Sequence, residues 1–444
     1  MTNCQYAATA VTVNCSLSTS LAIAKGNQIP VMNQPSYAAA FRCIGPVCED
    51  PCCGEWDIPL DKRTYEKYQG FSNENLGATV SRFVILNEPH QPEELYGLIK
   101  RTSSGVCPFY AADRLCDIQR QYGPELLSAS CSIYPRSLSV VNGQLEGALS
   151  LSCPEAVRSV LLVPDIEDRV FSLHSGEFRT DNVYQLANDQ GGQDTKPEPL
   201  FLPVRKMLID IIRDRSRPLW DRLLRVGYLC LELESLNPKR TELLLQSNLL
   251  TLRALTNSGL LQEEIDHLER NPKVRLGTIF GLTEVLMRDG SSVRLQDTFL
   301  SFVNGIRRSI DSPATSDIKA FLRAERKYHS PFFDRFPFIL ENYLINYIYQ
   351  TLFPYGRSGS YCFSLKSIFG EYLQMATQFA WVNGLLIGVA GDHQGAFAEE
   401  HVVKAVQSFT RAFEHDPSGL HAMNEYIHRS GLDNLQGMSI LLRP

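Results

Sequence analysis

Cysteines are the residues of this chain whose number and spacing point most directly to chemistry. The chain has 444 residues and 12 cysteines. Most of these fall in one quarter of the chain, between residues 43 and 153: Cys43, Cys48, Cys52, Cys53, Cys107, Cys116, Cys131 and Cys153. Thiolates are soft ligands that suit zinc, copper(I) and iron–sulfur clusters. Their concentration in one region therefore indicates a site and not a bias in composition.

A disulfide framework is the first alternative for such a cluster. Residues 1–33 do not resemble a signal peptide, because their only basic residue, Lys25, follows the mildly apolar stretch Ala7–Val13. No run of about 18 apolar residues predicts a membrane-spanning helix. We therefore expect a cytoplasmic protein, in which thiols stay reduced and clustered cysteines more often bind metal. Disulfides and unrelated buried thiols remain open.

The spacing of the cysteines favours an iron–sulfur centre over structural zinc. Paired CxxC knuckles, which are typical of structural zinc sites, do not occur. Cys107 and Cys153 are each followed by proline, as ligating cysteines of iron–sulfur sites often are. Zinc stays the alternative. Four arginines lie within five residues of a cysteine and could hydrogen-bond sulfur atoms, although scattered surface arginines would look the same: Arg42, Arg114, Arg136 and Arg158.

The amino-acid composition restricts the fold classes and the binding partners that we expect. Hydrophobic residues make up 44% and charged residues 21%, as in an ordinary globular protein, and the net charge is −6. We expect no nucleic-acid partner, because a bulk basic surface is missing. The predicted fold class is mainly α, with an irregular cysteine-rich metal-binding N-terminal domain packed on a C-terminal helical bundle. The expected divisions are a poorly ordered leader (1–36), an iron–sulfur domain (37–160), a linker (161–200) and a helical domain (201–444).

Local patterns predict elements in both domains. In the cysteine region we expect helices over Asp61–Gln69 and Pro92–Lys100, and a hairpin over Leu138–Leu151 that turns at Asn142-Gly143. Beyond residue 200, apolar residues at steps of three and four predict helices almost throughout. These helices are Val204–Arg213, Leu219–Leu236, Glu242–Thr256, Leu261–Glu269, Arg275–Arg288, Val293–Ile310, Ser316–Lys327, Pro337–Thr351, Leu365–Val389, Ala398–His415, Gly419–Ser430 and Asp433–Leu442.

The motifs around the cysteines resemble a known family. The strings FRC-x4-CEDPCCGEW, CPFY-x5-CDIQRQYGPELLSASCSIYPR and LSCPEAV resemble the flagellin lysine-N-methylase family. The N-terminal part is also similar to zinc- or iron-chelating cysteine-rich proteins. The resemblance is strong over 37–160 and weaker in FFDRFPFILENYLINYIYQTLFP and SFTRAFEHDPSGL near the C-terminus. Residues 160–320 match in length and helical character only, and residues 1–36 do not match.

The resemblance implies a reaction and its cofactors. It implies a [4Fe–4S] cluster and transfer of methyl groups from S-adenosylmethionine to lysine side chains of flagellin or a related surface protein. All eight clustered cysteines are ligand candidates. Because one cluster needs four ligands, we prefer those whose flanking residues match best, although which four bind stays open: Cys53, Cys107, Cys116 and Cys131.

The binding mode of the methyl donor is not defined by the sequence. Methylation needs a neutral lysine amine and alignment of nitrogen, methyl carbon and sulfur. No Gly-rich loop of the Rossmann type occurs, because Gly384, Gly388 and Gly391 have the wrong spacing and a helical context. The C-x3-C-x2-C pattern of radical enzymes starts at Cys48 and fails at Glu55.

The C-terminal motifs supply the remaining site candidates. A tyrosine–carboxylate pocket that holds a lysine ammonium and accepts its proton is expected from Glu341, Tyr343 and Tyr347, unless the tyrosines are core aromatics. Arg411 and His415 share a helical turn and complete the catalytic candidates, unless His415 merely ends its helix. The cofactor-binding candidates are Asn342, Asn346, Arg42 and Arg136.

Other functions compatible with the sequence are not enzymatic. The missing donor fingerprint favours an iron–sulfur or zinc-binding scaffold, or a redox sensor, whose helical domain binds a protein partner. A structural zinc protein is the third possibility. In each case we expect a protein partner or substrate, and the oligomeric state stays open.

Overall fold

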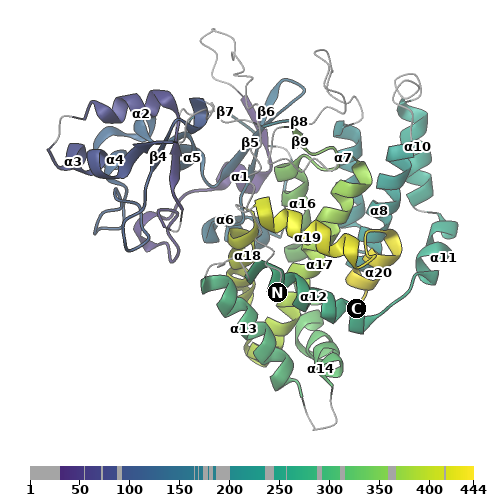
Figure 1. Ribbon diagram of the computed structural model, residues 1–444. Coiled ribbons are helices and arrows are strands. Elements are labelled where there is room, and N and C mark those ends of the chain that lie inside the picture. Colours follow the sequence, from purple (N-terminus) through teal and green to yellow (C-terminus); the bar gives the residue numbers. More distant parts are fainter. Residues whose placement is uncertain are drawn as a thin grey trace, which may run out of the picture.

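A computed structural model gives the architecture of the protein. It describes residues 31–444 apart from 55, 72–73, 88–92, 165, 169, 174–178, 180–183, 187–200, 236–244, 257, 288–292, 311–315, 359–366 and 415–416. Figure 1 shows a small lobe in purple and blue beside a larger helical body in teal, green and yellow, with a β-sheet between them. Helices dominate the described residues, as the sequence predicts.

The small lobe, which we call the cysteine lobe, is built around a three-stranded antiparallel sheet. Strand β4 (Gly97–Ile99) lies between β2 (Ile58–Leu60) and β3 (Val84–Leu86). Short helices cover the sheet: α2 (Lys62–Gln69), α3 (Glu74–Phe83), α4 (Asp117–Tyr122) and α5 (Ala129–Ile133). The predicted helix starting at Asp61 is confirmed, because Asp61 accepts a hydrogen bond from the Thr64 amide at 2.9 Å. The α-helix predicted over Pro92–Lys100 is wrong, since Glu93–Leu95 form only a 3-10 turn and cross-strand pairing places Gly97–Ile99 in β4.

A second, six-stranded sheet joins the cysteine lobe to the helices. Its order is β7-β1-β6-β5-β8-β9, with β1 (Val31–Gln34), β5 (Arg136–Val141), β6 (Gln144–Leu149), β7 (Val170–Leu173), β8 (Tyr184–Leu186) and β9 (Arg357–Ser358). The predicted hairpin is present: β5 and β6 pair through a turn in which Asn142 (φ 50°) and Gly143 (φ 76°) are left-handed.

Three of these strands lie where the sequence suggested no regular structure. The described end of the expected leader forms β1, whose Met32 pairs with Leu145 of β6. The expected linker contributes β7 and β8. These strands are only three or four residues long, and their partner strands are distant in sequence. No local alternation of apolar and polar residues therefore predicts them.

The helical body follows the predicted order. Its helices are α7 (Phe201–Arg213), α8 (Leu219–Ser235), α10 (Leu245–Thr256), α11 (Gly259–His267), α12 (Pro272–Met287), α13 (Val293–Arg308), α14 (Asp317–Ala324), α15 (Ser330–Arg335), α16 (Phe338–Thr351), α17 (Ile368–His393), α18 (Glu399–Phe413), α19 (Pro417–Arg429) and α20 (Leu435–Leu442). A π-helical segment, Glu325–His329, joins α14 to α15.

Helix α17 forms the centre of this body and packs against α13 at very close range. A Cβ atom on Gly305 of α13 would lie 1.7 Å from the carbonyl oxygen of Gly388. Glycine at this crossing therefore lets the two backbones touch. Helix α17 also packs against α8, α18 and α20 (Figure 1).

The two largest hydrophobic cores of the described residues show which segments belong together. The larger core runs through the helical body and includes residues of α1 (Ser36–Ala40), β6 and α6 (Pro154–Leu161). The smaller core fills the cysteine lobe and contains Tyr68, Phe109 and Ile118. The hairpin and α6 thus pack with the helical body, although they fall inside the region 37–160 that the sequence suggested was one domain. Among the described residues, no helix is long and apolar enough to cross a membrane.

Candidate functional site

Four cysteines pack against the core of the cysteine lobe. Cys107 is buried there, and Cys53, Cys116 and Cys131 are partly buried against the same core. The Cys107 amide donates a hydrogen bond to the Cys53 carbonyl at 2.7 Å, which brings two loops together. Cys116 directly precedes α4, and the Cys131 amide is bound by the Ser128 hydroxyl that caps α5. The four loops that the sequence motifs mark therefore converge on one small region.

Burial controls the protonation of these thiols. It raises the pKa of Cys107 to about 12 and is also the largest cause of the raised pKa of Cys116 and Cys131. The thiols also raise one another's pKa by charge repulsion. Cys52, Cys107 and Cys116 each raise the pKa of Cys131 in this way. Cys107, Cys116 and Cys131 are therefore neutral at pH 7, and a metal would displace their protons on binding.

The other four cysteines lie toward the helical body. Cys153 directly precedes α6, and burial raises its pKa to about 12, with smaller contributions from Cys48 and Cys52. Cys43 is exposed and Cys48 is partly buried. The pKa of Cys52 is raised first by a hydrogen bond with Cys53 and then by burial of the thiol, although the residue keeps an exposed edge. Cys52 lies close to both groups, because it raises the pKa of Cys107, Cys116 and Cys131 as well as that of Cys153. The lobe-core set (Cys53, Cys107, Cys116 and Cys131) and the junction set (Cys43, Cys48, Cys52 and Cys153) therefore meet at the adjacent Cys52 and Cys53.

The lobe-core set fits a thiolate-bound metal by its donor chemistry. Four soft donors from four segments of the chain share one core. Cys107, Cys116 and Cys131 would repel one another when ionised, and a bound cation relieves such repulsion. No three His, Cys, Asp or Glu side chains of the described residues are yet arranged as a ligand shell. The shared location of the four cysteines and the affinity of thiolates for soft metals are therefore what support a metal site here.

The arginines near the cysteines have backbone and carboxylate partners. Arg42 donates to the carbonyl of Phe41 at 2.8 Å, and Arg136 lies over the Phe41 ring with its guanidinium carbon 5.2 Å from the ring centroid. Arg114 donates to the carbonyl of Cys48, and Arg158 binds Glu155 at 2.9 Å. These bonds fix the loops that carry the cysteines. The role of Arg42 and Arg136 in cofactor binding stays a prediction.

A buried polar network connects the cysteine lobe to α18. Arg411 forms an ion pair with Asp50 (3.1 Å) and donates to the carbonyl of Gly54 (3.1 Å). Gln407, one turn earlier, donates to Asp50 at 2.6 Å and to the carbonyl of Ser152 at 3.0 Å. The positive charge of Arg411 also lowers the pKa of Cys52, although other causes outweigh it. The predicted candidate Arg411 thus lies beside the thiols.

Three of the candidates on α16 anchor that helix. The Asn346 amide pairs with both backbone groups of Leu149, donating at 2.8 Å and accepting at 3.3 Å. Asn342 donates to the carbonyl of Val163 at 2.8 Å. Glu341 is 2% exposed and ion-paired with Arg222 (2.8 Å) and Arg215 (2.7 Å). These contacts join α16 to β6, to the segment that follows α6, to α8 and to the segment that precedes α8.

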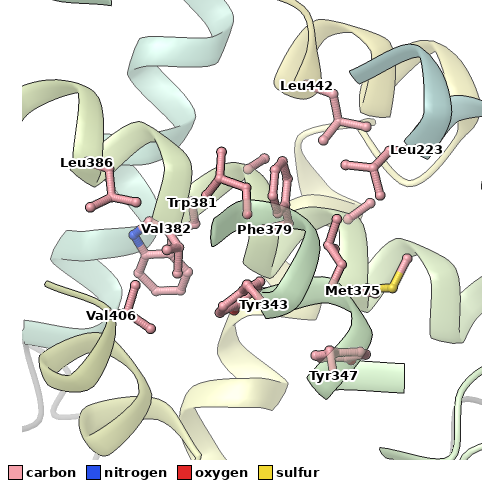
Figure 2. Packing of buried hydrophobic residues seen from close by; sticks show 14 of the residues in the cluster. Leu223, Tyr343, Tyr347, Met375, Phe379, Trp381, Val382, Leu386, Val406 and Leu442 are labelled. Carbon is pink, nitrogen blue, oxygen red and sulfur yellow. The ribbon is translucent and has the colours of Figure 1, made fainter. Parts of the chain in front are cut away.

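Tyr343 and Tyr347 face α17 on the other side of α16. Figure 2 shows both rings pointing toward Met375 and Phe379 in the packed interior. Burial raises the pKa of both hydroxyls, so each is neutral. The carboxylate that influences Tyr347 is Glu371 of α17, and Glu341, two residues from Tyr343 on α16, has its own arginine partners. The expected tyrosine–carboxylate arrangement therefore involves a different glutamate.

Several residues of these arrangements were not predicted from the sequence. Asp50, Gln407 and Glu371 lie outside any spacing pattern, and only the packing of distant helices brings them to the site. Glu414, three residues after Arg411, accepts a hydrogen bond from the Ser150 hydroxyl at 2.7 Å. The candidate His415 lies outside the described residues.

Parts of the sequence match a known protein family. A family model described as the FliB lysine N-methylase C-terminal domain matches residues 205–441. The match includes residues 205–320, for which we expected agreement in length and helical character only. No solved structure matches the chain.

Curated relatives agree with the family model. The flagellar biosynthetic protein FliU of Salmonella muenchen is 34% identical over 149 residues, which cover 32% of this chain and 87% of that protein. The lysine-N-methylases of Salmonella typhimurium and Salmonella choleraesuis are 34% identical over 135 residues, covering 30% of this chain and 33% of each enzyme. The matched stretch thus spans a third of the two lysine-N-methylases. Because the family model covers more than half of the sequence, the chain belongs to the FliB lysine N-methylase family.

Proposed function

We propose that this protein transfers methyl groups from S-adenosylmethionine to lysine side chains of a protein substrate, with flagellin or a related surface protein as the substrate class. The single observation that carries the proposal is the match of the helical body to the lysine N-methylase domain. The name of a relative as a flagellar biosynthetic protein supports the choice of substrate class.

The proposal includes a [4Fe–4S] cluster in the cysteine lobe. Cys53, Cys107, Cys116 and Cys131 would hold it, because these four thiols converge in one core and are soft donors. When bound, such a cluster cross-links four loops and supplies a one-electron redox centre. Zinc is the alternative occupant of the same thiols.

The residues at the lobe boundary would then position the cluster relative to the helices. Arg411 contacts both Asp50 and the carbonyl of Gly54, next to Cys53. Its guanidinium therefore holds the loop that carries two cysteines and places a positive charge close to the thiol set. This arrangement supports a role for Arg411 in positioning, which we add to the catalytic prediction made from its spacing.

The direct test is methyl transfer by the anaerobically purified full chain. Purified flagellin and a control protein rich in surface lysines are incubated with isotopically labelled S-adenosylmethionine, and lysine masses are read by mass spectrometry. We expect labelled methyllysine on flagellin that requires the protein. A chain that contains its metal and labels neither protein would contradict the proposal. It would favour a metal-binding scaffold or redox sensor, for which the separate thiol-lined core of the cysteine lobe is the supporting observation.

A further inference from the structure

A stripe of polar side chains crosses the otherwise apolar interface between α16 and α17. Glu371, Gln374 and Gln378 follow one another on α17 at steps of three and four, so they share one face of the helix. Tyr347 of α16 faces that stripe, because Glu371, Gln374 and Gln378 all act on its hydroxyl. The Gln374 amide donates to the Tyr347 hydroxyl at 3.4 Å. Buried polar groups in such a place need partners.

Two members of this stripe have a side-chain oxygen without a protein partner among the described residues, and of these only Oε1 of Gln374 is fully buried. The carboxylate of Glu371 is 6% exposed and has no hydrogen-bond or ion-pair partner among the described residues. The Oε1 atom of Gln374 is also buried without a partner. A buried carboxylate left alone is costly, and an added cation or donor would relieve that cost.

The surroundings of Glu371 leave its charge uncompensated. Burial alone raises its pKa to about 7, and no neighbouring charge contributes. The titratable groups that face it are Tyr347 on α16 and Cys230 on α8, and burial keeps both of these neutral at pH 7. Glu234 of α8 is exposed and accepts a hydrogen bond from the amide of Phe369. No basic side chain of the described residues is among them.

The backbone approaches Glu371 closely from the sheet side. A Cβ atom on Gly356 would lie 2.9 Å from Oε1 of Glu371, and Gly356 has a left-handed φ of 77°. The left-handed backbone favours glycine at 356, and any Cβ there would push the Glu371 side chain aside. Glu371 lies in the first turn of α17, where the preceding Ile368 and Phe369 are only partly buried, so the stripe begins one turn from the surface.

We propose that Glu371, Tyr347 and Gln374 form the binding site for the lysine side chain of the substrate, and that Glu371 accepts the proton of the lysine ammonium. This inference rests on the proposed function. A single buried carboxylate beside a tyrosine and an amide oxygen recognises a primary alkylammonium group, because it offers one negative charge and neutral acceptors around it.

With Glu371 as the proton acceptor, every proton and electron pair of the methyl transfer is accounted for. The lysine ammonium gives one proton to the Glu371 carboxylate and becomes a neutral amine. The nitrogen lone pair forms the bond to the methyl carbon of the sulfonium donor, and the breaking carbon–sulfur bond leaves its electron pair on sulfur. The products are a methylammonium group, a neutral thioether and a protonated Glu371 that returns its proton to solvent. A carboxylate with a raised pKa is suited to this exchange near neutral pH.

The test compares the full-length wild type with Glu371→Gln and, as the matched control on the adjacent α8, Glu234→Gln. Thermal unfolding is measured with n-butylammonium chloride, using 1-butanol and sodium chloride as controls for apolar and ionic effects. We expect n-butylammonium to raise Tm in the wild type and Glu234→Gln, increasingly from pH 6 to pH 8 as Glu371 ionises. We expect no specific rise in Glu371→Gln.

Methyl transfer gives the second readout. We expect Glu371→Gln to slow transfer by about 10²–10⁴-fold and to lose the acid limb of the pH–rate profile, while Glu234→Gln keeps both. Equal stabilisation of wild type and Glu371→Gln by n-butylammonium, or an unchanged rate and pH profile, would overturn the inference. If the wild type transfers no methyl group, the proposed function fails, and the n-butylammonium titration alone decides whether Glu371 binds an alkylammonium.

Discussion

Arg411 of α18 forms a buried ion pair with Asp50 of the cysteine lobe, with Nη1 of the arginine 3.1 Å from Oδ1 of the aspartate. Their side chains are 10% and 6% exposed. The two residues are 361 positions apart, 411 minus 50, so this contact forms only when the cysteine lobe docks on the helical body. It therefore connects the stability of the thiol region with the packing of α18.

Arg411→Ala is expected to weaken this docking strongly. Removal of one partner leaves Asp50 buried without its ion-pair partner, which typically costs about 3–5 kcal/mol. Urea unfolding measures the loss, and limited proteolysis shows whether the cysteine lobe is cleaved first. Arg429→Ala is the control, because Arg429 forms an exposed pair with Glu425 that is expected to contribute little. Equal stabilities of the two variants would contradict a role for Arg411 in docking.

Glu341→Gln is expected to destabilise the protein through its arginines. Glu341 and Arg222 are 2% and 6% exposed, and the Arg222 guanidinium would stay buried without its ion-pair partner. The expected loss is again about 3–5 kcal/mol in urea unfolding. Because Glu341 does not face the tyrosine pair, we expect the position of the acid limb of the methyl-transfer profile to stay unchanged. A shifted limb at unchanged stability would show that Glu341 acts in the reaction and not in packing.

Glu371 is expected to give the stability of the protein an unusual pH dependence. Burial raises its pKa from 4.5 to about 7 in the folded state. The folded state therefore binds more protons than the unfolded state between these values, so the contribution of Glu371 is present below pH 4.5 and is lost as pH rises through 7. The difference corresponds to about 3 kcal/mol.

The matched variant isolates this contribution. Glu371→Gln cannot ionise, so its unfolding free energy minus that of the wild type should increase from pH 5 to pH 8 and then level off. Parallel urea titrations at each pH measure the difference. A difference that stays constant over this range would show that Glu371 ionises in the folded protein as easily as in the unfolded chain.

Elements with a local sequence signal were predictable, whereas elements that depend on residues far along the chain were not. The helices and the hairpin were predictable because their signals are local: the apolar period of α7 to α20, the cap at Asp61 and the Asn142-Gly143 turn. The family was also readable, because the cysteine motifs are continuous strings. Strands β1, β7 and β8 were not predictable, since each is short and depends on partners far along the chain.

The surroundings of Glu341 and Glu371 also depend on residues far along the chain. Glu341 lies in a motif with two tyrosines, which made it the natural candidate, but Arg215 and Arg222 are more than one hundred residues earlier in the chain. Glu371 lies in a segment without a motif. Its unpaired state depends on what α8, α16 and the segment at Gly356 place beside it, and none of these is visible from its neighbours in sequence.

Replacement of single cysteines is expected to separate the lobe-core set from the rest. Cys116→Ser and Cys131→Ser should each lose most of the bound iron and sulfide, or zinc, and destabilise the cysteine lobe, because ligand loss removes a cross-link between loops. Cys43→Ser should keep its metal, since Cys43 is exposed and outside the lobe core. Cys230→Ala, in the buried core of the helical body, controls for loss of a thiol that cannot reach the lobe. Metal analysis and the visible spectrum of anaerobically purified protein give the result. Full iron content in both Cys116→Ser and Cys131→Ser would refute this ligand set, and loss of metal in Cys43→Ser alone would assign the site to the junction cysteines.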